Sequence, residues 1–82
     1  MLIGRVSAFF ARPVVAGITL TGDLKQGDRI HIKGHTTDIT LTVESIQVEN
    51  KPVAAARAGD SIGLKVPDRV RPGDGVYRVT EG

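Results

Sequence analysis

The residues best suited to metal chemistry in this sequence are His31 and His35, with Asp38 three residues further on. Imidazole nitrogens and carboxylate oxygens are common zinc ligands. The alternation of residue types places His31 on a strand and His35 just beyond it, so about 13 Å separates them if the chain is extended. One ion could not bind both unless the chain folded back. The pattern therefore predicts no metal site and no cofactor.

Catalytic groups are not expected in any familiar arrangement. The 82 residues contain no cysteine, no Ser-His-Asp order and no paired carboxylates in a recognised motif. The phosphate-binding pattern G-x-x-x-x-G-K-[ST] is also missing. A chain of this length can build one core but not a deep, walled active site. We therefore expect a single domain over residues 1–82 that is not an enzyme, has no catalytic residues and does not bind GTP alone.

The basic residues suggest a different chemistry, which is contact with RNA phosphates. The formal net charge is +2 and the pI is about 9.4, so an anionic partner is permitted but not demanded. The candidate contacts are Arg5, Arg12, Arg29, Lys33, Arg57 and Lys65. The alternative is an ordinary surface of mixed charge, because Asp28, Glu44 and Asp60 lie close to these cations in sequence.

Aromatic side chains that could stack on bases are scarce. Alternation over residues 2–10 places the even-numbered residues, Phe10 among them, in the core and leaves Phe9 as the candidate exposed contact for RNA or protein. The alternative is that Phe9 covers the end of the barrel.

Strand-like alternation recurs along the whole chain and must position these groups. The core faces are predicted from Val14 to Leu20, at Ile30 and Ile32, from Ile39 to Val43, from Ile62 to Val66, and in a short strand over residues 75–79. The parity of apolar residues changes near Glu44-Ser45, which predicts a bulge or a change of face there. Residues 49–56 are expected to form a loop, and residues 80–82 to fray.

One turn signal occurs three times, as Gly27-Asp28, Gly59-Asp60 and Gly73-Asp74, each ahead of a strand. Glycine reaches positive φ at little cost, and Asp accepts hydrogen bonds from N–H groups that a turn leaves unpaired. Repeated use of one strand-entry turn without a long helical pattern predicts an all-β fold. We expect a closed or nearly closed antiparallel barrel of six or seven strands.

This ordered set of segments resembles the second, barrel domain of the elongation factor Tu-like translational GTPases. The resemblance lies in Gly4-Arg5-Val6, in Leu24 to Asp28 with Ile30 and Ile32, in Val43 to Ile46, and in the later Gly-Asp segments. It implies a pocket near Glu44, Gln47 and Ser61. Gln47 stands where the family has an Arg, and Asn50-Lys51-Pro52 lacks the final Asp of the guanine-reading N-K-x-D motif.

The resemblance implies a translation-factor-like module that binds ribosomal or transfer RNA, or the ribosome, through a basic outer face. The alternative is a protein-interaction module that docks on a partner protein or self-associates. A monomer is expected in preference to an oligomer. The absence of cysteine fits a reducing cytoplasm, and the lack of a long apolar run argues against membrane insertion.

Overall fold

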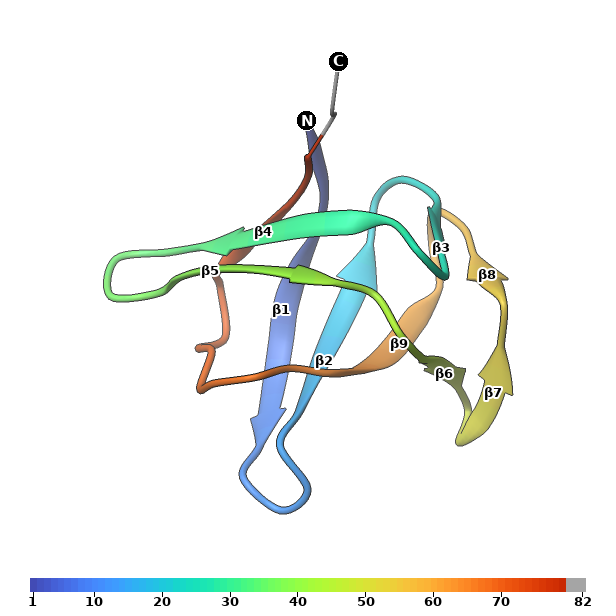
Figure 1. Cartoon of the computed structure of the whole chain (residues 1–82), viewed down its shortest axis with the longest axis horizontal. Helices are drawn as coiled ribbons and strands as arrows, with labels where there is room; N and C mark the ends of the chain where they lie inside the picture. Colours follow the sequence, from blue (N-terminus) through green and yellow to red (C-terminus); the bar gives the residue numbers. More distant parts are fainter. Residues whose placement is uncertain (80–82) are drawn as a thin grey trace.

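The computed structural model describes residues 1–79, which form ten strands. The expected fraying of residues 80–82 lies outside the described residues. Figure 1 shows the strands wrapped around one core, with the start of β1 beside the end of β10. In chain order they are β1 (Leu2–Phe10), β2 (Val15–Leu20), β3 (Leu24–Lys25), β4 (Arg29–Lys33), β5 (Asp38–Thr42), β6 (Ile46–Val48), β7 (Lys51–Val53), β8 (Ala55–Ala56), β9 (Ser61–Lys65) and β10 (Gly75–Arg78).

Eight of these strands form one antiparallel sheet in the order β5-β4-β10-β1-β2-β9-β6-β7, and β3 pairs with β8 in a separate two-stranded sheet. The prediction of an all-β antiparallel fold is therefore confirmed. The finer prediction, a closed or nearly closed barrel of six or seven strands, is wrong, because the main sheet has eight strands and curves only into a half-barrel. Its edges, β5 and β7, each pair with a single neighbour in the sheet.

The three Gly-Asp turns share one geometry. They span Lys25–Asp28, Arg57–Asp60 and Arg71–Asp74, and the glycine φ angles are 95°, 95° and 96°. In each turn the N–H of the last residue donates to the carbonyl of the first, at 3.0 to 3.1 Å. The Asp carboxylate accepts the N–H of the first residue at 2.9 to 3.0 Å. Positive φ at the third position is the requirement of a type II turn, which explains the glycine.

Each turn is also fastened to one buried residue of another segment by two hydrogen bonds. The turn glycine donates its N–H to the carbonyl of that residue, whose N–H donates in return to the carbonyl of the turn Asp, at 2.8 to 2.9 Å. The residues bound in this way are Val43, Leu20 and Val6, in the order of the turns. The repeated turn therefore joins the elements together as well as starting strands.

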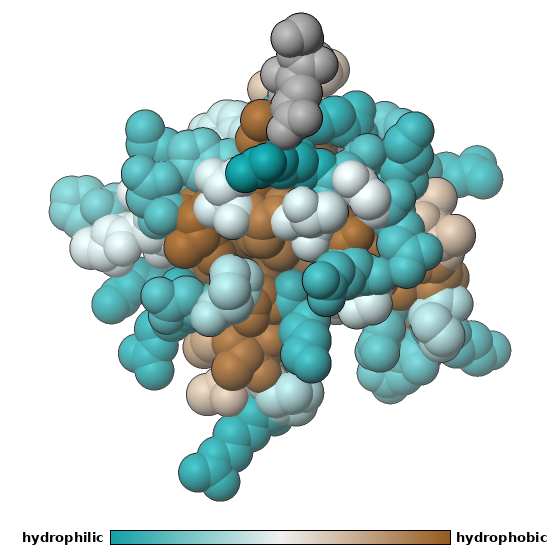
Figure 2. Space-filling view, in the orientation of Figure 1, coloured by the Kyte–Doolittle hydropathy of each residue, from teal (hydrophilic) through white to brown (hydrophobic). Residues whose placement is uncertain are grey.

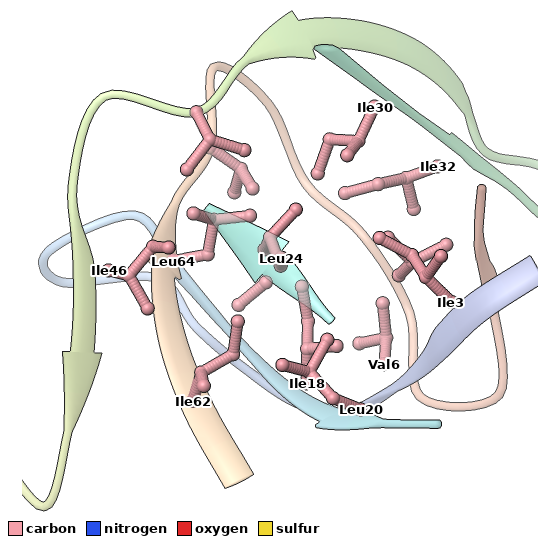
Figure 3. Close-up of a cluster of buried hydrophobic side chains, with 14 of the residues drawn as sticks. Ile3, Val6, Ile18, Leu20, Leu24, Ile30, Ile32, Ile46, Ile62 and Leu64 are labelled. Carbon is pink, nitrogen blue, oxygen red and sulfur yellow. The ribbon is translucent and has the colours of Figure 1, made fainter. Parts of the chain in front are cut away.

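The core consists of aliphatic side chains from all sides of the half-barrel (Figure 3). Ile30 and Ile32 of β4 are fully buried, as the alternation predicts. Val43 and Ile46 are also buried, so the predicted change of parity near Glu44-Ser45 is confirmed. Burial of each such side chain contributes about 1.5–3 kcal/mol relative to exposure.

The predicted parity of β1 fails at both ends of the strand. Its register against β10 shifts between Leu2 and Gly4, and its register against β2 shifts between Val6 and Ala8. Each shift inserts one unpaired residue and moves the following side chains to the other face. Ile3 is therefore buried while Leu2 is exposed. Simple alternation cannot locate such bulges, because both parities of this segment contain apolar residues.

The segment predicted as a loop over residues 49–56 contains two short strands instead. Residues Glu49 and Asn50 form the two-residue connection between β6 and β7, and both have positive φ, at 53° and 64°. Two consecutive positive φ angles define the type I′ turn that suits the twist of a hairpin. Asparagine is common in this conformation, but glutamate is not. Because Glu49 stands where Asn or Gly is usual, the sequence lacked the signal from which this hairpin could have been predicted.

Candidate functional site

A shallow groove of about 400 Å³ runs over the outer face of β2, β9 and β6. We call it the glycine groove. The hairpin between β1 and β2 forms one side, and the turn between β6 and β7 forms the other. Its lining consists of Phe10, Arg12, Pro13, Val15, Gly17, Gln47, Glu49, Asn50, Ser61, Ile62 and Gly63.

The floor of the groove is made by two glycines on neighbouring strands. Gly17 of β2 lies directly opposite Gly63 of β9 in the antiparallel register, and Gln47 of β6 lies opposite Gly63 on its other side. A Cβ atom on Gly63 would lie 3.7 Å from Val15 Cγ1, which is ordinary van der Waals contact. A Cβ atom on Gly17 would come no closer than 3.4 Å to Ser7 Oγ. Neither glycine is therefore required by the packing around it.

Other glycines of the chain have clear structural reasons. A Cβ atom on Gly4 would lie 2.8 Å from the backbone oxygen of Thr19, and one on Gly34 would lie 1.8 Å from Asp74 Oδ1. Glycine inside a strand is destabilising by about 0.5–1 kcal/mol relative to alanine. Gly17 and Gly63 carry the same cost, although a Cβ atom would fit at either position. What they do provide is access to the sheet backbone at the groove floor.

The two walls of the groove differ in chemistry. Phe10, at the end of β1, is 56% exposed and supplies an aromatic surface, and Arg12 supplies a cation to the same lining. Opposite them, Glu49 and Asn50 occupy the left-handed region of the hairpin turn. The groove thus combines an apolar surface, one cation, one anion and amide groups above a bare stretch of backbone. Such a lining suits a ligand that is both apolar and rich in hydrogen-bonding groups.

Two further hollows adjoin this face. One, of about 310 Å³, shares Pro13, Val15, Gln47 and Gly63 with the groove and continues to Ser45 and Lys65. The second is a wedge of about 510 Å³ beside the edge of β5, which we call the β5 wedge. Its lining residues are Thr40, Leu41, Thr42, Glu44, Lys65, Val66 and Pro67.

The predicted pocket residues are only partly brought together. Gln47 and Ser61 line the glycine groove, and so does Arg12, which was predicted as an RNA contact. Glu44 lies on the connection between β5 and β6 and lines the β5 wedge instead, whereas Gln47 lines the groove. Lys65 lines the wedge and the smaller hollow.

The remaining predicted cations lie on separate elements. Arg5 is on β1, where its guanidinium donates to the carbonyl of Gly73 at 3.5 Å. Arg29 and Lys33 lie at the two ends of β4, and Arg57 opens the turn before β9. All four are exposed. No finding tests these residues as RNA contacts, and that role stays a prediction tied to the translation-factor interpretation.

Phe9 does not have the exposure predicted for it. It lies opposite the buried Ala16, packs against the core and is half-buried, while Phe10 is exposed. The guanidinium of Arg69 lies over the Phe9 ring, 5.9 Å from its centroid. The bulge between Val6 and Ala8 causes this reversal. The exposed aromatic of this strand is therefore Phe10, a groove residue that the sequence analysis placed in the core.

His31 and Asp38 do lie together, with His31 Nε2 in contact with Asp38 Oδ1 across the β4–β5 hairpin. Among residues 1–79, no group of three or more His, Cys, Asp or Glu side chains is arranged to hold a metal ion. The same residues include no helix long and apolar enough to cross a membrane. The two facing glycines were missed in the sequence, although a glycine inside a strand is the signal by which each could have been noticed.

Comparisons with known proteins point to proteases. A protein of Methanocaldococcus jannaschii named as an uncharacterised protease is 44% identical over 80 residues, which is 96% of this chain and 20% of that protein. A collagenase of Porphyromonas gingivalis is 37% identical over 78 residues, 93% of this chain and 22% of that protein. The chain therefore spans about a fifth of the length of these curated relatives. No family model matches the sequence.

The solved structures agree in fold. The C-terminal domain of a proposed U32 peptidase of Geobacillus thermoleovorans superimposes with a TM-score of 0.90, covering 96% of this chain and 92% of that chain, at 20% sequence identity. A selenomethionine variant of that domain gives a TM-score of 0.89, with 94% and 98% of the two chains covered. At this level of identity the likeness shows the fold alone.

These comparisons correct the functional prediction. The assignment to elongation factor Tu-like translational GTPases is wrong, and so is the translation-factor, RNA-binding function that depended on it. The expectation that the protein is not an enzyme is also contradicted, because the relatives are named as a protease and a collagenase. The error arose because Gly-Asp turns and alternating strands describe a small β-structure of this kind without distinguishing the families that use it.

Proposed function

We propose that residues 1–82 form one β-domain of a protease and that the glycine groove binds an extended polypeptide, the class of molecule on which a protease acts. The relatives named as a protease and a collagenase match nearly the whole chain, which supports the connection to peptide hydrolysis. In this proposal the domain contributes to the reaction by holding part of the substrate chain.

The observation that carries the binding half of the proposal is the juxtaposition of Gly17 and Gly63. Two facing residues without side chains let a second backbone approach the sheet closely. An extended polypeptide presents side chains on alternate sides and amide groups between them. Phe10 and Val15 offer apolar contacts to such side chains, while Gln47 and Ser61 offer hydrogen bonds to the amides.

Direct binding to an unfolded polypeptide tests this proposal. Fluorescein-labelled, reduced casein would be titrated with the 82-residue chain and followed by fluorescence anisotropy. We expect saturable binding that Gly63→Val weakens at least about tenfold, because two methyl groups would fill the groove floor. Lys33→Ala, at an exposed position of β4 outside the groove, is the control and should bind like the wild type.

Hydrolysis is tested with the polypeptide that contains these 82 residues, in the form in which its native organism makes it. We expect it to cleave unfolded casein, and we expect Gly63→Val to raise KM while changing kcat little, since the groove is proposed to hold substrate away from the reacting bond. Circular dichroism must show that the variant keeps its strands. Absence of casein binding by the wild-type chain, or equal binding by Gly63→Val, would remove the groove from the proposal.

A further inference from the structure

A second surface has a different character from the groove, and it arises where two neighbouring strands separate. β6 pairs with β9 at only two positions, Ile46 with Leu64 and Gln47 with Gly63. Before Ile46 the chain bends away into β5, while the chain after β9 continues through Val66 in another direction. The β5 wedge is the space that opens between them. Figure 2 shows hydrophobic residues gathered in the middle of the face that carries β5, between polar residues.

The edge of β5 presents backbone groups to this wedge. The N–H of Gly34 donates to the carbonyl of Thr37, and the N–H of Val43 donates to that of Asp28, which identifies the hydrogen-bonded pairs at both ends of the β4–β5 hairpin. Hydrogen-bonded and non-hydrogen-bonded pairs alternate in an antiparallel ladder. Thr40 and Thr42 therefore belong to the other set, with N–H and carbonyl groups that point away from β4. Both residues line the wedge.

The two edges of the main sheet are protected very differently. β7, at one edge, contains Lys51 and Pro52, and charged residues and proline are the usual means of preventing an edge from pairing with another chain. β5, at the opposite edge, contains no proline or lysine, and its one charged residue, Asp38, stands at its first position and contacts His31 of β4. The rest of β5 reads Ile-Thr-Leu-Thr, which favours the β conformation. The edge of β5 therefore lacks the proline and lysine that would prevent it from pairing with a further strand.

We propose that the edge of β5 binds an extended segment of a second polypeptide, which adds to the sheet as a further strand. Thr40 and Thr42 supply its backbone hydrogen bonds. An apolar side chain of the segment packs against Leu41, Val66 and Pro67. Glu44 and Lys65 border the wedge and form no ion pair with any residue of the described range 1–79. The segment is thus one with a basic and an acidic residue on either side of its apolar positions.

A capped seven-residue peptide of alternating Thr and Val, with Lys at one end and Glu at the other, is a direct probe. Nuclear magnetic resonance of the isotope-labelled chain would record hydrogen exchange at each amide. We expect the peptide to slow exchange at the Thr40 and Thr42 amides at least about tenfold at saturation, because free edge amides become hydrogen-bonded. The backbone N–H groups of an extended peptide point alternately to its two edges. N-methylation of those that face β5 should weaken binding at least about tenfold more than N-methylation of those that face away.

Variants of the edge test the same interaction from the protein side. Thr40→Pro removes one outward N–H without removing a bond to β4, and it should abolish peptide binding while the strands are retained. Thr40→Val keeps the N–H and should bind as the wild type does. Equal binding of the two methylated peptides would overturn the proposal, as would protection confined to the glycine groove. Concentration-dependent dimerisation through β5 in place of peptide binding would also overturn it, since the occupant would then be a second copy.

Discussion

Gly17 and Gly63 face each other across the ladder between β2 and β9, and each has room for a methyl group that the sequence does not supply. Facing glycines in the middle of two paired strands leave a strip of sheet backbone uncovered. At this strip lie Gln47 of the neighbouring β6, Ser61 of β9 itself, and Phe10 and Arg12 from the β1–β2 hairpin. The candidate binding groove therefore depends on side chains that are missing as well as on those that are present.

Substitution of these glycines should separate stability from binding. Gly17→Ala and Gly63→Ala should leave the free energy of unfolding unchanged or raise it by up to about 1 kcal/mol, because alanine suits a strand better than glycine. Such a gain corresponds to a rise of about 4–8 °C in the melting temperature of a domain of this size. Thermal unfolding measures it.

Gly4→Ala is the control for the glycine series. Its Cβ atom would lie 2.8 Å from the backbone oxygen of Thr19, so this variant should melt at a lower temperature than the wild type. If Gly63→Ala lowered the melting temperature as much as Gly4→Ala does, the groove glycine would have a structural role and the interpretation of the floor would fail.

Gly34 should be coupled energetically to Asp74. Asp74 is 6% exposed as a residue, and its Oδ2 accepts the Arg71 N–H at 2.9 Å. A Cβ atom on Gly34 would lie 1.8 Å from the other oxygen, so Gly34→Ala should cost about 2 kcal/mol or more. In an Asp74→Ala background the nearest remaining contact is Asp74 Cβ at 3.3 Å, and the same change should cost much less.

A double-mutant cycle in urea measures this coupling. The four proteins are the wild type, the two single variants and the double variant. An interaction energy near zero would mean that the carboxylate moves aside without cost, contrary to the expectation from its hydrogen bond to Arg71.

The turn between β6 and β7 should be improved by residues that accept positive φ. Glu49 and Asn50 have φ angles of 53° and 64°, and a type I′ turn strongly favours Asn-Gly. The double substitution Glu49→Asn with Asn50→Gly should therefore raise the free energy of unfolding by about 1 kcal/mol, measured by urea unfolding. Glu44→Asn, at an exposed position without positive φ, serves as the control and should show no such gain. A gain of equal size at Glu44 would point to charge removal as the cause.

Much of the secondary structure was predictable because its causes are local. The glycine that a type II turn requires and the Asp that closes it stand next to each other, so all three turns were visible as dipeptides. The period of two along β4 likewise identified Ile30 and Ile32 as core residues. The reversal of Phe9 and Phe10 was not predictable, since it depends on which residue of β1 is left unpaired against β2.

In the candidate site, too, single residues were predictable from local patterns, whereas their arrangement in space was not. Gln47, Ser61 and Arg12 could be singled out as residues, but their meeting in one groove depends on β2, β9 and β6 being neighbours, although they are far apart in the chain. The family assignment failed for a related reason. The motifs that supported it report how turns and strands are built, and unrelated functions can share that construction.

Residue order alone was sufficient to specify an antiparallel β-structure with three identical strand-entry turns, because turn geometry and side-chain alternation are properties of a few consecutive residues. The eight-stranded half-barrel, the free edge of β5 and the pairing of Gly17 with Gly63 arise from contacts between distant segments. Such contacts depend on register and on bulges, where a shift of one residue turns a side chain from the core to the surface. The pattern of a few consecutive residues does not determine that shift. The half-barrel, the β5 edge and the facing glycines are therefore decided by the tertiary structure.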